Sequence, residues 1–340
     1  MKRFVCIFLA ALAILTACNK NSEQQVVNVI LETDIGNDVD DALALGLAYN
    51  YVDAGKMNLL AITINKEGSA PGEFVDIMNT FYGHPEIPIG VICNGAYCED
   101  DAVNYAKAVV DMKNEDGTPA FARSITDYDS LDDAPTLYRK ILPNQEDNSV
   151  VIVSVGFSTN LIKLLETQAD EYSPLSGREL VKQKVKLLVT MAGNFENEEF
   201  HEYNVMKDIP AAKVIFETWP TPVVTSPFEL GIQTCYPASS IEKDFDWAEL
   251  NPIVEAYKSY LPMPYDRPMW DPTALMYAVE GEKWFTMSPK GQISITDEGS
   301  TLFTATPDGD RKYMMVDTLQ AKAIIEHFVE LIPFNPKSTR

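Results

Sequence analysis

The chain has 340 residues, of which 46% are hydrophobic, and its 50 acidic and 27 basic residues give a net charge of −23. So acidic a chain is unsuited to neutralising phosphates, which excludes nucleic acid as an expected partner. Its five cysteines are too few for a disulfide scaffold, although Cys93 and Cys98 could pair across a loop.

The first 18 residues have the features of a secretory signal. A basic start precedes an apolar run that is too short for an ordinary transmembrane helix. The ending Leu15-Thr-Ala-Cys18 resembles a bacterial lipobox, which implies cleavage before Cys18 and lipid attachment to that cysteine. A plain cleaved signal or a membrane anchor remains the alternative.

The predicted organisation is a signal peptide at 1–17, a linker at 18–26 and one α/β domain at 27–340. We expect an envelope lipoprotein that contacts the membrane only through its lipid. Asn19 after the cysteine favours the outer membrane, with the domain facing the periplasm or the cell surface.

An acidic loop follows the first predicted strand. The β-branched run from Val27 to Leu31 predicts a strand, Gly36 and Asn37 interrupt it, and residues 42–49 predict a helix. Four aspartates lie between the two elements: Asp34, Asp38, Asp40 and Asp41.

Carboxylates this close together raise one another's pKa unless a cation intervenes. The loop offers hard carboxylate oxygens and contains no Cys or His, and such a ligand set suits Ca²⁺ or Mg²⁺. Helix capping is the alternative, and it explains Asp40 and Asp41 but not Asp34. An EF-hand is excluded because Val39 and Leu45 stand where its Gly and Glu belong. A haloacid-dehalogenase-like phosphatase is disfavoured because Glu32 stands at the nucleophile position.

Strands and helices alternate along the rest of the domain. Strands are predicted at 57–64, 87–92, 149–155, 185–190 and 222–225, and helices at 71–82, 161–166, 209–218 and 318–331. This alternation predicts a mainly parallel, Rossmann-like sheet flanked by helices, with ligands at the carboxyl ends of the strands. Residues 292–316 predict a C-terminal addition rich in β-hairpins, and the polar, irregular segment 93–133 is expected to cover the site.

Three later segments also carry polar groups next to predicted elements. A Gly156–Asn160 turn follows one strand, and a loop from Met191 to Asn204 is rich in amides and carboxylates that suit sugar hydroxyls. That loop could equally be a solvated acidic surface. Asp271 precedes Pro272, a common first residue of helices, so capping is again an alternative role.

In order and spacing these segments resemble the inosine-uridine preferring nucleoside hydrolase family. Residues 32–42, Glu-Thr-Asp-Ile-Gly-Asn-Asp-Val-Asp-Asp-Ala, are similar to the family's Asp-x-Asp-x-Gly-x-Asp-Asp-Ala, with two extra residues and Glu for the first Asp. The later matches are Ser158-Thr-Asn160, Gly193-Asn194, Glu202-Tyr-Asn204 and Trp270-Asp-Pro272.

The resemblance implies a Ca²⁺ site and a ribose site. The implied calcium ligands are Asp34, Asp41, the carbonyl of Thr159, and Asp271. The implied substrate-binding residues are Asp40, Asn65, Asn194, Glu202, Tyr203 and Asn204. It also implies a nucleoside substrate and a homo-oligomer, a dimer or tetramer.

The implied reaction is hydrolysis of an N-ribosidic bond in nucleoside salvage. It requires an activated water, whose proton Asp34 would accept, and carboxylates that stabilise a cationic sugar. The departing base also needs a proton, yet Trp270 replaces the family's histidine, and indole has none to give at neutral pH. Tyr265 and Asp266 are candidate acids, of which Asp266 is chemically the better; alternatively, Trp270 stacks on a base that needs less help.

Two other functions remain open at this stage. The same fold could hydrolyse another ribosyl compound, or a lipoprotein could bind a nucleoside or sugar without cleaving it. The position of Asp34 argues against pure binding, because a binding protein has no use for a carboxylate poised to take a proton from water.

Overall fold

The computed structural model describes residues 26–96 and 103–339. The predicted signal peptide, Cys18 and Cys98 therefore lie outside the described residues. In the described ranges, no helix combines the length and the apolar character that crossing a membrane requires.

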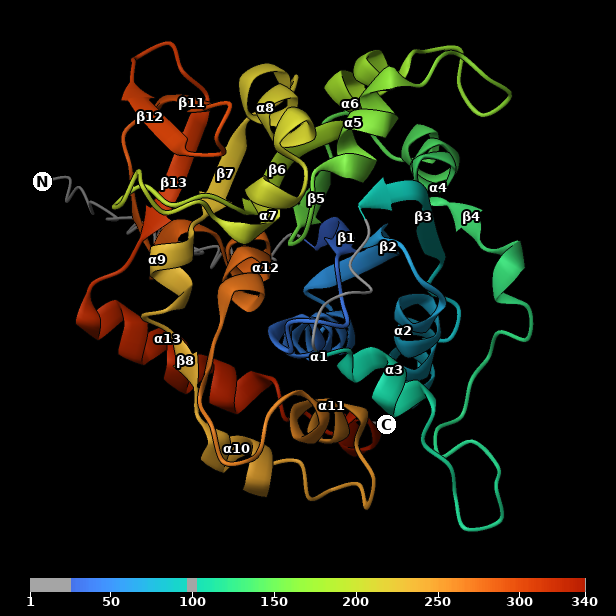
Figure 1. Cartoon of the computed structure of the whole chain (residues 1–340). Helices are drawn as coiled ribbons and strands as arrows, with labels where there is room; N and C mark the ends of the chain where they lie inside the picture. Colours follow the sequence, from blue (N-terminus) through green and yellow to red (C-terminus); the bar gives the residue numbers. More distant parts are fainter. Residues whose placement is uncertain (1–25, 97–102, 340) are drawn as a thin grey trace, which may run out of the picture.

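A sheet of 11 strands runs through the described part of the molecule (Figure 1). Seven strands lie parallel in the order β7-β6-β5-β1-β2-β3-β4. Their bounds are β1 Val27–Thr33, β2 Met57–Lys66, β3 Ile89–Ala96, β4 Asp132–Asp133, β5 Val150–Ser154, β6 Val185–Met191 and β7 Val223–Ser226. The predicted mainly parallel sheet is confirmed.

The C-terminal strands extend this sheet. β13 (Arg311–Met315) pairs parallel with β7, whereas β11 (Gly291–Ile295), β12 (Thr301–Ala305) and β10 (Thr286–Met287) add antiparallel pairs. The predicted hairpin-rich addition is thus the antiparallel end of the central sheet. β8 (Cys235–Tyr236) and β9 (Arg267–Pro268) form a separate pair.

Helices cover both faces of the sheet (Figure 1). One face packs its apolar core against α1 (Asp40–Asp53), α2 (Ser69–Tyr82), α11 (Pro252–Tyr260), α12 (Trp270–Glu280) and α13 (Thr318–Leu331). The other packs against α4 (Ala134–Ile141), α5 (Thr159–Glu166), α6 (Gly177–Lys184) and α8 (Ile209–Thr218). Shorter helices are α3 (Tyr105–Val110), α7 (Tyr203–Lys207), α9 (Phe228–Gly231) and α10 (Ala238–Lys243).

Local sequence explains why these helices pack as they do. On α5, the apolar residues Leu161, Leu164 and Leu165 recur at helical spacing and are buried, while Lys163 is half-buried and donates to the Cys93 and Asn94 carbonyls. On α1 every residue from Asp40 to Tyr51 is buried, so this helix lies inside the molecule and brings its two aspartates with it.

The helices change faces next to β1. α1 connects β1 to β2 on one face, whereas α5 and α6 connect β5 to β6 on the other, and β1 and β5 are neighbours. In open α/β sheets such a switch leaves a crevice beyond the carboxyl ends of the strands. Asp34 and Gly156 lie just beyond the ends of these two strands.

Two predictions about elements need correction. Segment 93–133 is not wholly irregular, because α3 forms in it and buries Tyr105 and Val109 in the core. The helix expected to start at Pro272 begins at Trp270, so Asp271 lies in its first turn and Met269 is the residue before it.

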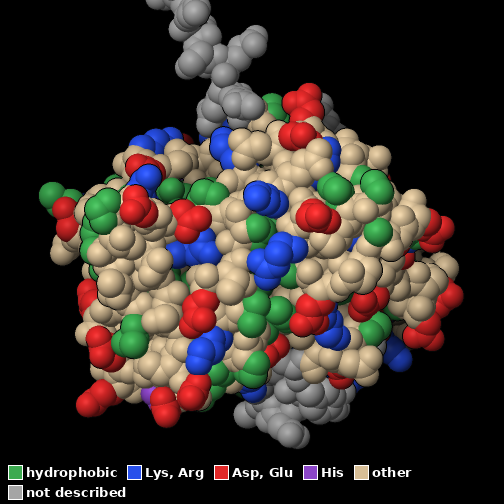
Figure 2. Space-filling model, turned by 90° about the horizontal axis from the view of Figure 1, so that it is seen from above, with side chains coloured by type: hydrophobic (Ala, Val, Ile, Leu, Met, Phe, Trp, Pro, Cys, Tyr) green, Lys and Arg blue, Asp and Glu red, His purple; other side chains and the backbone are tan. Residues whose placement is uncertain are grey.

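One face of the molecule shows how mixed the surface is. In Figure 2, hydrophobic, basic and acidic side chains alternate over this face and do not gather by type. Among the described residues, no part of this face carries charges of one sign alone.

Candidate active site

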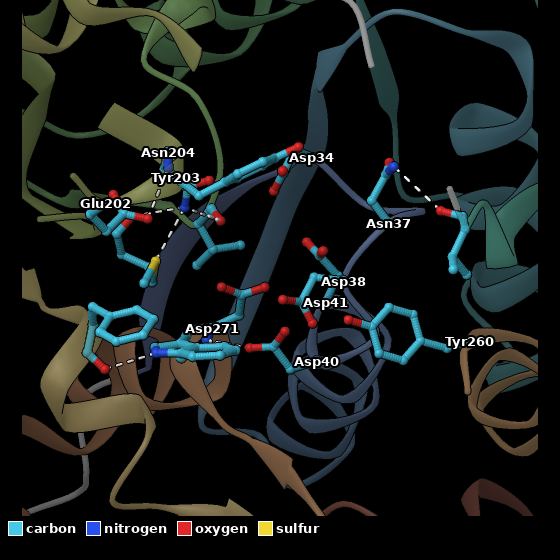
Figure 3. Close-up of a pocket in the computed structure, with 15 residues that line it drawn as sticks. Asp34, Asn37, Asp38, Asp40, Asp41, Glu202, Tyr203, Asn204, Tyr260 and Asp271 are labelled. Carbon is cyan, nitrogen blue, oxygen red and sulfur yellow. Dashed lines mark hydrogen bonds between the residues drawn. The ribbon is translucent and has the colours of Figure 1, made fainter. Parts of the chain in front are cut away.

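A cavity of about 390 Å³ opens at the carboxyl end of the sheet, a size that suits a small organic ligand (Figure 3). It is lined by Asp34, Asn37, Asp38, Asp40, Asp41, Val103, Val155, Met191, Glu202, Tyr203, Asn204, Phe228, Tyr260, Trp270 and Asp271. Figure 3 shows Asp38, Asp40 and Asp41 across this space from the Glu202–Asn204 segment, with Asp34 drawn near Tyr203.

The acidic loop is held by its own side chains. Gly36 has a φ of +128°, a conformation that disfavours any side chain. Thr33 accepts a hydrogen bond from the Ile35 N–H at 3.1 Å and donates its hydroxyl to Asp41. These contacts turn the chain from β1 into α1 and point the carboxylates into the cavity.

Helix capping does not account for Asp40 and Asp41. The residue at the capping position of α1 is Val39, and no side chain caps the helix. Instead, Asp40 Oδ2 accepts a hydrogen bond from the backbone N–H of Asp271 at 3.1 Å, which joins the starts of α1 and α12. Neither residue caps α1 through its side chain, although both lie in its first turn, where a negative charge complements the helix dipole.

Burial and mutual repulsion perturb these carboxyl groups strongly. Burial raises the pKa of Asp34 to about 7, and the charge of Lys66 opposes that rise. Burial also raises the pKa values of Asp40, Asp41 and Asp271 well above the ordinary range, and neighbouring aspartates raise them further. In the absence of a cation, the folded protein therefore holds these groups at a cost.

Asn65 is fixed close to Asp34 by a buried polar network. Its Nδ2 donates to the Phe157 carbonyl at 2.8 Å and to Glu32 at 3.3 Å. Its Oδ1 is fully buried and has no hydrogen-bond partner in the described part of the chain. A Cβ at Gly156 would lie 2.6 Å from this oxygen and 2.7 Å from Asp34 Oδ1, so both oxygens face the glycine.

The Glu202–Asn204 segment forms the opposite wall. Glu202 accepts hydrogen bonds from the N–H groups of Gly193, Asn204 and Val205 at 2.8–3.1 Å, and burial raises its pKa to about 7. Asn204 Nδ2 donates to the carbonyls of Val155 and Met191 at 3.2 and 3.1 Å. These bonds dock the end of the loop against β5 and β6, whereas residues 196–199 in its middle are exposed to solvent.

The donor chemistry of the cavity fits a hard divalent cation. Asp34, Asp41 and Asp271 supply buried carboxylate oxygens, and the orphaned Asn65 Oδ1 adds an acceptor beside them. As the side chains stand, no three His, Cys, Asp or Glu residues in the described ranges converge as ready-made ligands. Thr159, the first residue of α5, donates its hydroxyl to Asp208 at 2.6 Å and is not among the lining residues.

Aromatic side chains line the remaining wall. The Trp270 indole N–H donates to the Phe228 carbonyl at 2.9 Å, and the two rings stack with centroids 5.5 Å apart. Arg267, paired with Asp38, places its guanidinium 4.8 Å from the Tyr260 ring centroid and 5.1 Å from that of Trp270. The indole proton is therefore already used, and the Trp270 ring contributes apolar surface to the cavity rather than a donor.

Several predicted residues lie outside the cavity lining. Asp266 accepts a hydrogen bond from the Ala238 N–H at 2.8 Å, and Tyr265 donates to the Tyr257 carbonyl at 2.7 Å. Asn194 accepts from the N–H groups of Glu196 and Asn197 and shapes its own loop. These partners argue against Asp266 and Tyr265 as acids for the leaving group.

Sequence reasoning missed four residues that shape the site. Asp38 was predicted only as a member of the acidic loop, without a role of its own. No role was predicted for Arg267, Phe228 or Tyr260. Asp38 and Arg267 are 229 positions apart, and a single sequence carries no signal for such a pair. Tyr260 lies ten positions before Trp270, but its place in the site could be predicted only if α11 had been predicted first.

Fold and site together define a doubly wound α/β enzyme with a carboxylate-rich cavity at its switch point. A family model for inosine-uridine preferring nucleoside hydrolases matches residues 29–325. The chain therefore belongs to the inosine-uridine preferring nucleoside hydrolase family and is an N-glycosyl hydrolase. A search of curated proteins gives no match.

Solved structures support the same fold. A purine-preferring ribonucleoside hydrolase from Gardnerella vaginalis is 18% identical, with a TM-score of 0.66 and 90% of this chain and 99% of that chain covered. An inosine-guanosine nucleoside hydrolase is also 18% identical, with a TM-score of 0.67 and 90% and 97% covered. The type III effector XopQ, complexed with adenosine diphosphate ribose, is 14% identical, with a TM-score of 0.63 and 92% and 95% covered.

Proposed function

We propose that the protein is a Ca²⁺-dependent ribonucleoside hydrolase that releases a nucleobase and ribose for salvage. The observation that carries the proposal is the set of buried aspartates facing the Glu202–Asn204 segment across one small cavity. A ribose, which has several hydroxyl groups and becomes cationic in the reaction, matches such a lining.

We assign cation binding and sugar binding to two different sets of residues in the cavity. Asp34, Asp41 and Asp271, with the Thr159 carbonyl, would hold the cation after a small local rearrangement. A bound calcium ion would supply orientation of the ribose hydroxyls and a lowered pKa for the attacking water. Asp40, Asn65, Glu202 and Asn204 are proposed to surround the sugar.

Hydrolysis forms a bond between the water oxygen and the anomeric carbon and breaks the carbon–nitrogen bond. Asp34 accepts the proton of the water. The buried carboxylates stabilise the positive charge that the sugar carries only in the transition state. Both roles require charge at fixed positions, which the hydrogen-bonded acidic loop provides.

The departing base meets the aromatic wall. Trp270 and Phe228 give this side of the cavity an apolar aromatic lining, and the indole N–H is held by the Phe228 carbonyl. Tyr260 lines the same cavity, and burial raises the pKa of its hydroxyl to about 12, so it stays protonated at neutral pH. We propose that Tyr260 donates a hydrogen bond to the departing base, which leaves with the electron pair of the carbon–nitrogen bond and takes its proton from solvent water.

A substrate panel tests this function. Purified protein is incubated with inosine, uridine, adenosine, cytidine and adenosine diphosphate ribose, with and without Ca²⁺, and free base and ribose are quantified. Base release from a nucleoside that requires Ca²⁺ supports the proposal. Cleavage of adenosine diphosphate ribose alone would instead favour hydrolysis of another ribosyl compound. This compound is included because it is the ligand in the XopQ structure.

Two features outside the site are also proposed. Lipid attachment at Cys18 would anchor the domain in the cell envelope, facing the periplasm or the surface, and Cys18→Ser should release it from the membrane fraction. A homodimer or homotetramer is proposed from the family resemblance, and light scattering after size exclusion tests it.

A further inference from the structure

Lys66 places a buried ammonium group against the acidic loop. It is the last residue of β2, directly after Asn65, and is only 3% exposed. A Cβ built at Gly36, in the middle of the acidic loop, would lie 3.1 Å from Lys66 Nζ. The side chain therefore runs from the end of β2 to the underside of the loop that carries Asp34 and Asp38.

The space around this ammonium group is closed. The same Gly36 position is 3.3 Å from Ala106 Cβ and 3.7 Å from Asn104 Oδ1, so the start of α3 packs against the loop next to the ammonium group. The positive φ of Gly36 and the absence of a side chain there leave room for Nζ to approach. The lysine is thus fixed by packing and cannot swing out like a surface lysine.

Its charge acts on two proposed metal ligands. Its buried Nζ lies beside Gly36, which is two residues after Asp34 and two before Asp38, so the ammonium charge sits against the loop that carries these carboxylates. Arg267 plays a similar part at the other end of the loop, where it pairs with Asp38. A cation entering between Asp34 and Asp41 would meet the field of the ammonium group as well as that of the carboxylates.

We propose that Lys66 is a built-in partial counter-ion of the metal site, which supports the metal-free loop and weakens divalent-cation binding. The inference rests on the proposed calcium site. Lys66 stabilises the ionised loop when no metal is bound and repels the metal when it enters. Lys66 is a positioning residue in this scheme, and it contributes no atom to the reaction.

The test is a calcium titration of metal-free protein followed by calorimetry at fixed pH and ionic strength. Lys66→Met should bind Ca²⁺ at least about tenfold more tightly than the wild type, the order expected from removing one charge near a divalent cation. Its metal-free form should unfold at a lower temperature than the metal-free wild type. Lys66→Arg, which keeps the charge, should stay nearer to the wild type in affinity.

A matched control removes the same charge at a distance. Lys322 lies on α13, is 73% exposed, and pairs only loosely with Glu326 at 3.7 Å. Lys322→Met should leave calcium affinity within about twofold of the wild type, because exposed charges beyond a Debye length are screened. Tighter binding by Lys66→Met alone cannot come from damage to the fold, which would weaken binding.

The outcomes separate this inference from the proposed function. Wild-type protein that binds no calcium overturns the metal site itself. Wild-type protein that binds calcium with the same affinity as Lys66→Met, or more tightly, overturns the role of Lys66 alone. If Lys66→Met folds only with calcium present, the inference is supported; if it folds in neither state, Lys66→Gln takes its place under the same criteria.

Discussion

The buried aspartates predict an unusual dependence of stability on pH in the metal-free protein. The perturbation is removal of bound metal followed by a change of pH from 5.5 to 8. Asp34 has a folded-state pKa of about 7 against an ordinary 3.8, so between these values the folded protein binds a proton that the unfolded chain does not. The contribution of Asp34 to the free energy of unfolding should therefore fall as pH rises towards about 7 and stay constant above that pH.

The magnitude follows from the size of that difference. A carboxyl group whose pKa rises from 3.8 to about 7 costs the folded state roughly 4 kcal/mol at pH 8. Asp40, Asp41 and Asp271 have raised pKa values too and act with the same sign. Bound calcium should remove most of this cost, so the loaded protein should show little loss of stability across the same range.

The assay is urea unfolding at pH 5.5, 6.5, 7.5 and 8, with chelator-treated buffers and again with excess calcium. Asp34→Asn should make the metal-free profile less steep and stabilise the protein at pH 8, while abolishing turnover. Asp111→Asn removes an exposed carboxylate paired with Lys107 and should leave the slope unchanged. Metal-free wild-type protein that is as stable at pH 8 as at pH 5.5 would refute the reasoning.

Three substitutions test other parts of the account. Gly156→Ala would push a methyl group to within 2.6 Å of Asn65 Oδ1 and 2.7 Å of Asp34 Oδ1, so kcat/KM in steady-state assays should fall at least about 100-fold. Tyr260→Phe should lower kcat by roughly 10²-fold in the same assays and leave calcium affinity unchanged; an unaltered kcat would remove Tyr260 from the mechanism. Glu280→Gln should destabilise the protein by about 3 kcal/mol in urea unfolding and spare kcat/KM, because this buried carboxylate pairs with His327 and Lys283 far from the cavity.

The sequence predicted the scaffold well because its signals are local. The run from Val27 and the Gly36–Asn37 break indicate a strand and a loop without any knowledge of the rest of the chain. The ranges of α8 and α13 agree with the predicted helices at 209–218 and 318–331, where apolar periodicity is strong. The position of the site at the carboxyl end of the sheet could also be predicted, because parallel strands bring Asp34, Asn65 and the loop after β6 to the same end.

The aromatic wall could not be predicted in the same way. Phe228, Tyr260 and Arg267 come from short elements or element ends whose positions depend on packing between distant segments. Asp266 was favoured as the acid because it is close to Trp270 in sequence, yet the backbone of residues 266–270 turns its carboxylate toward the Ala238 N–H. Closeness along the chain was a poor guide to closeness in the cavity.

The central claim is that the aspartate cavity is a calcium site used to cleave an N-ribosidic bond. It is tested most directly by titrating calcium into metal-free protein and measuring, in the same samples, bound calcium and the rate of hypoxanthine release from inosine. The account predicts that turnover rises in proportion to bound calcium, saturates at about one ion per chain, and disappears in Asp271→Asn. Full turnover in protein that holds no calcium would contradict it.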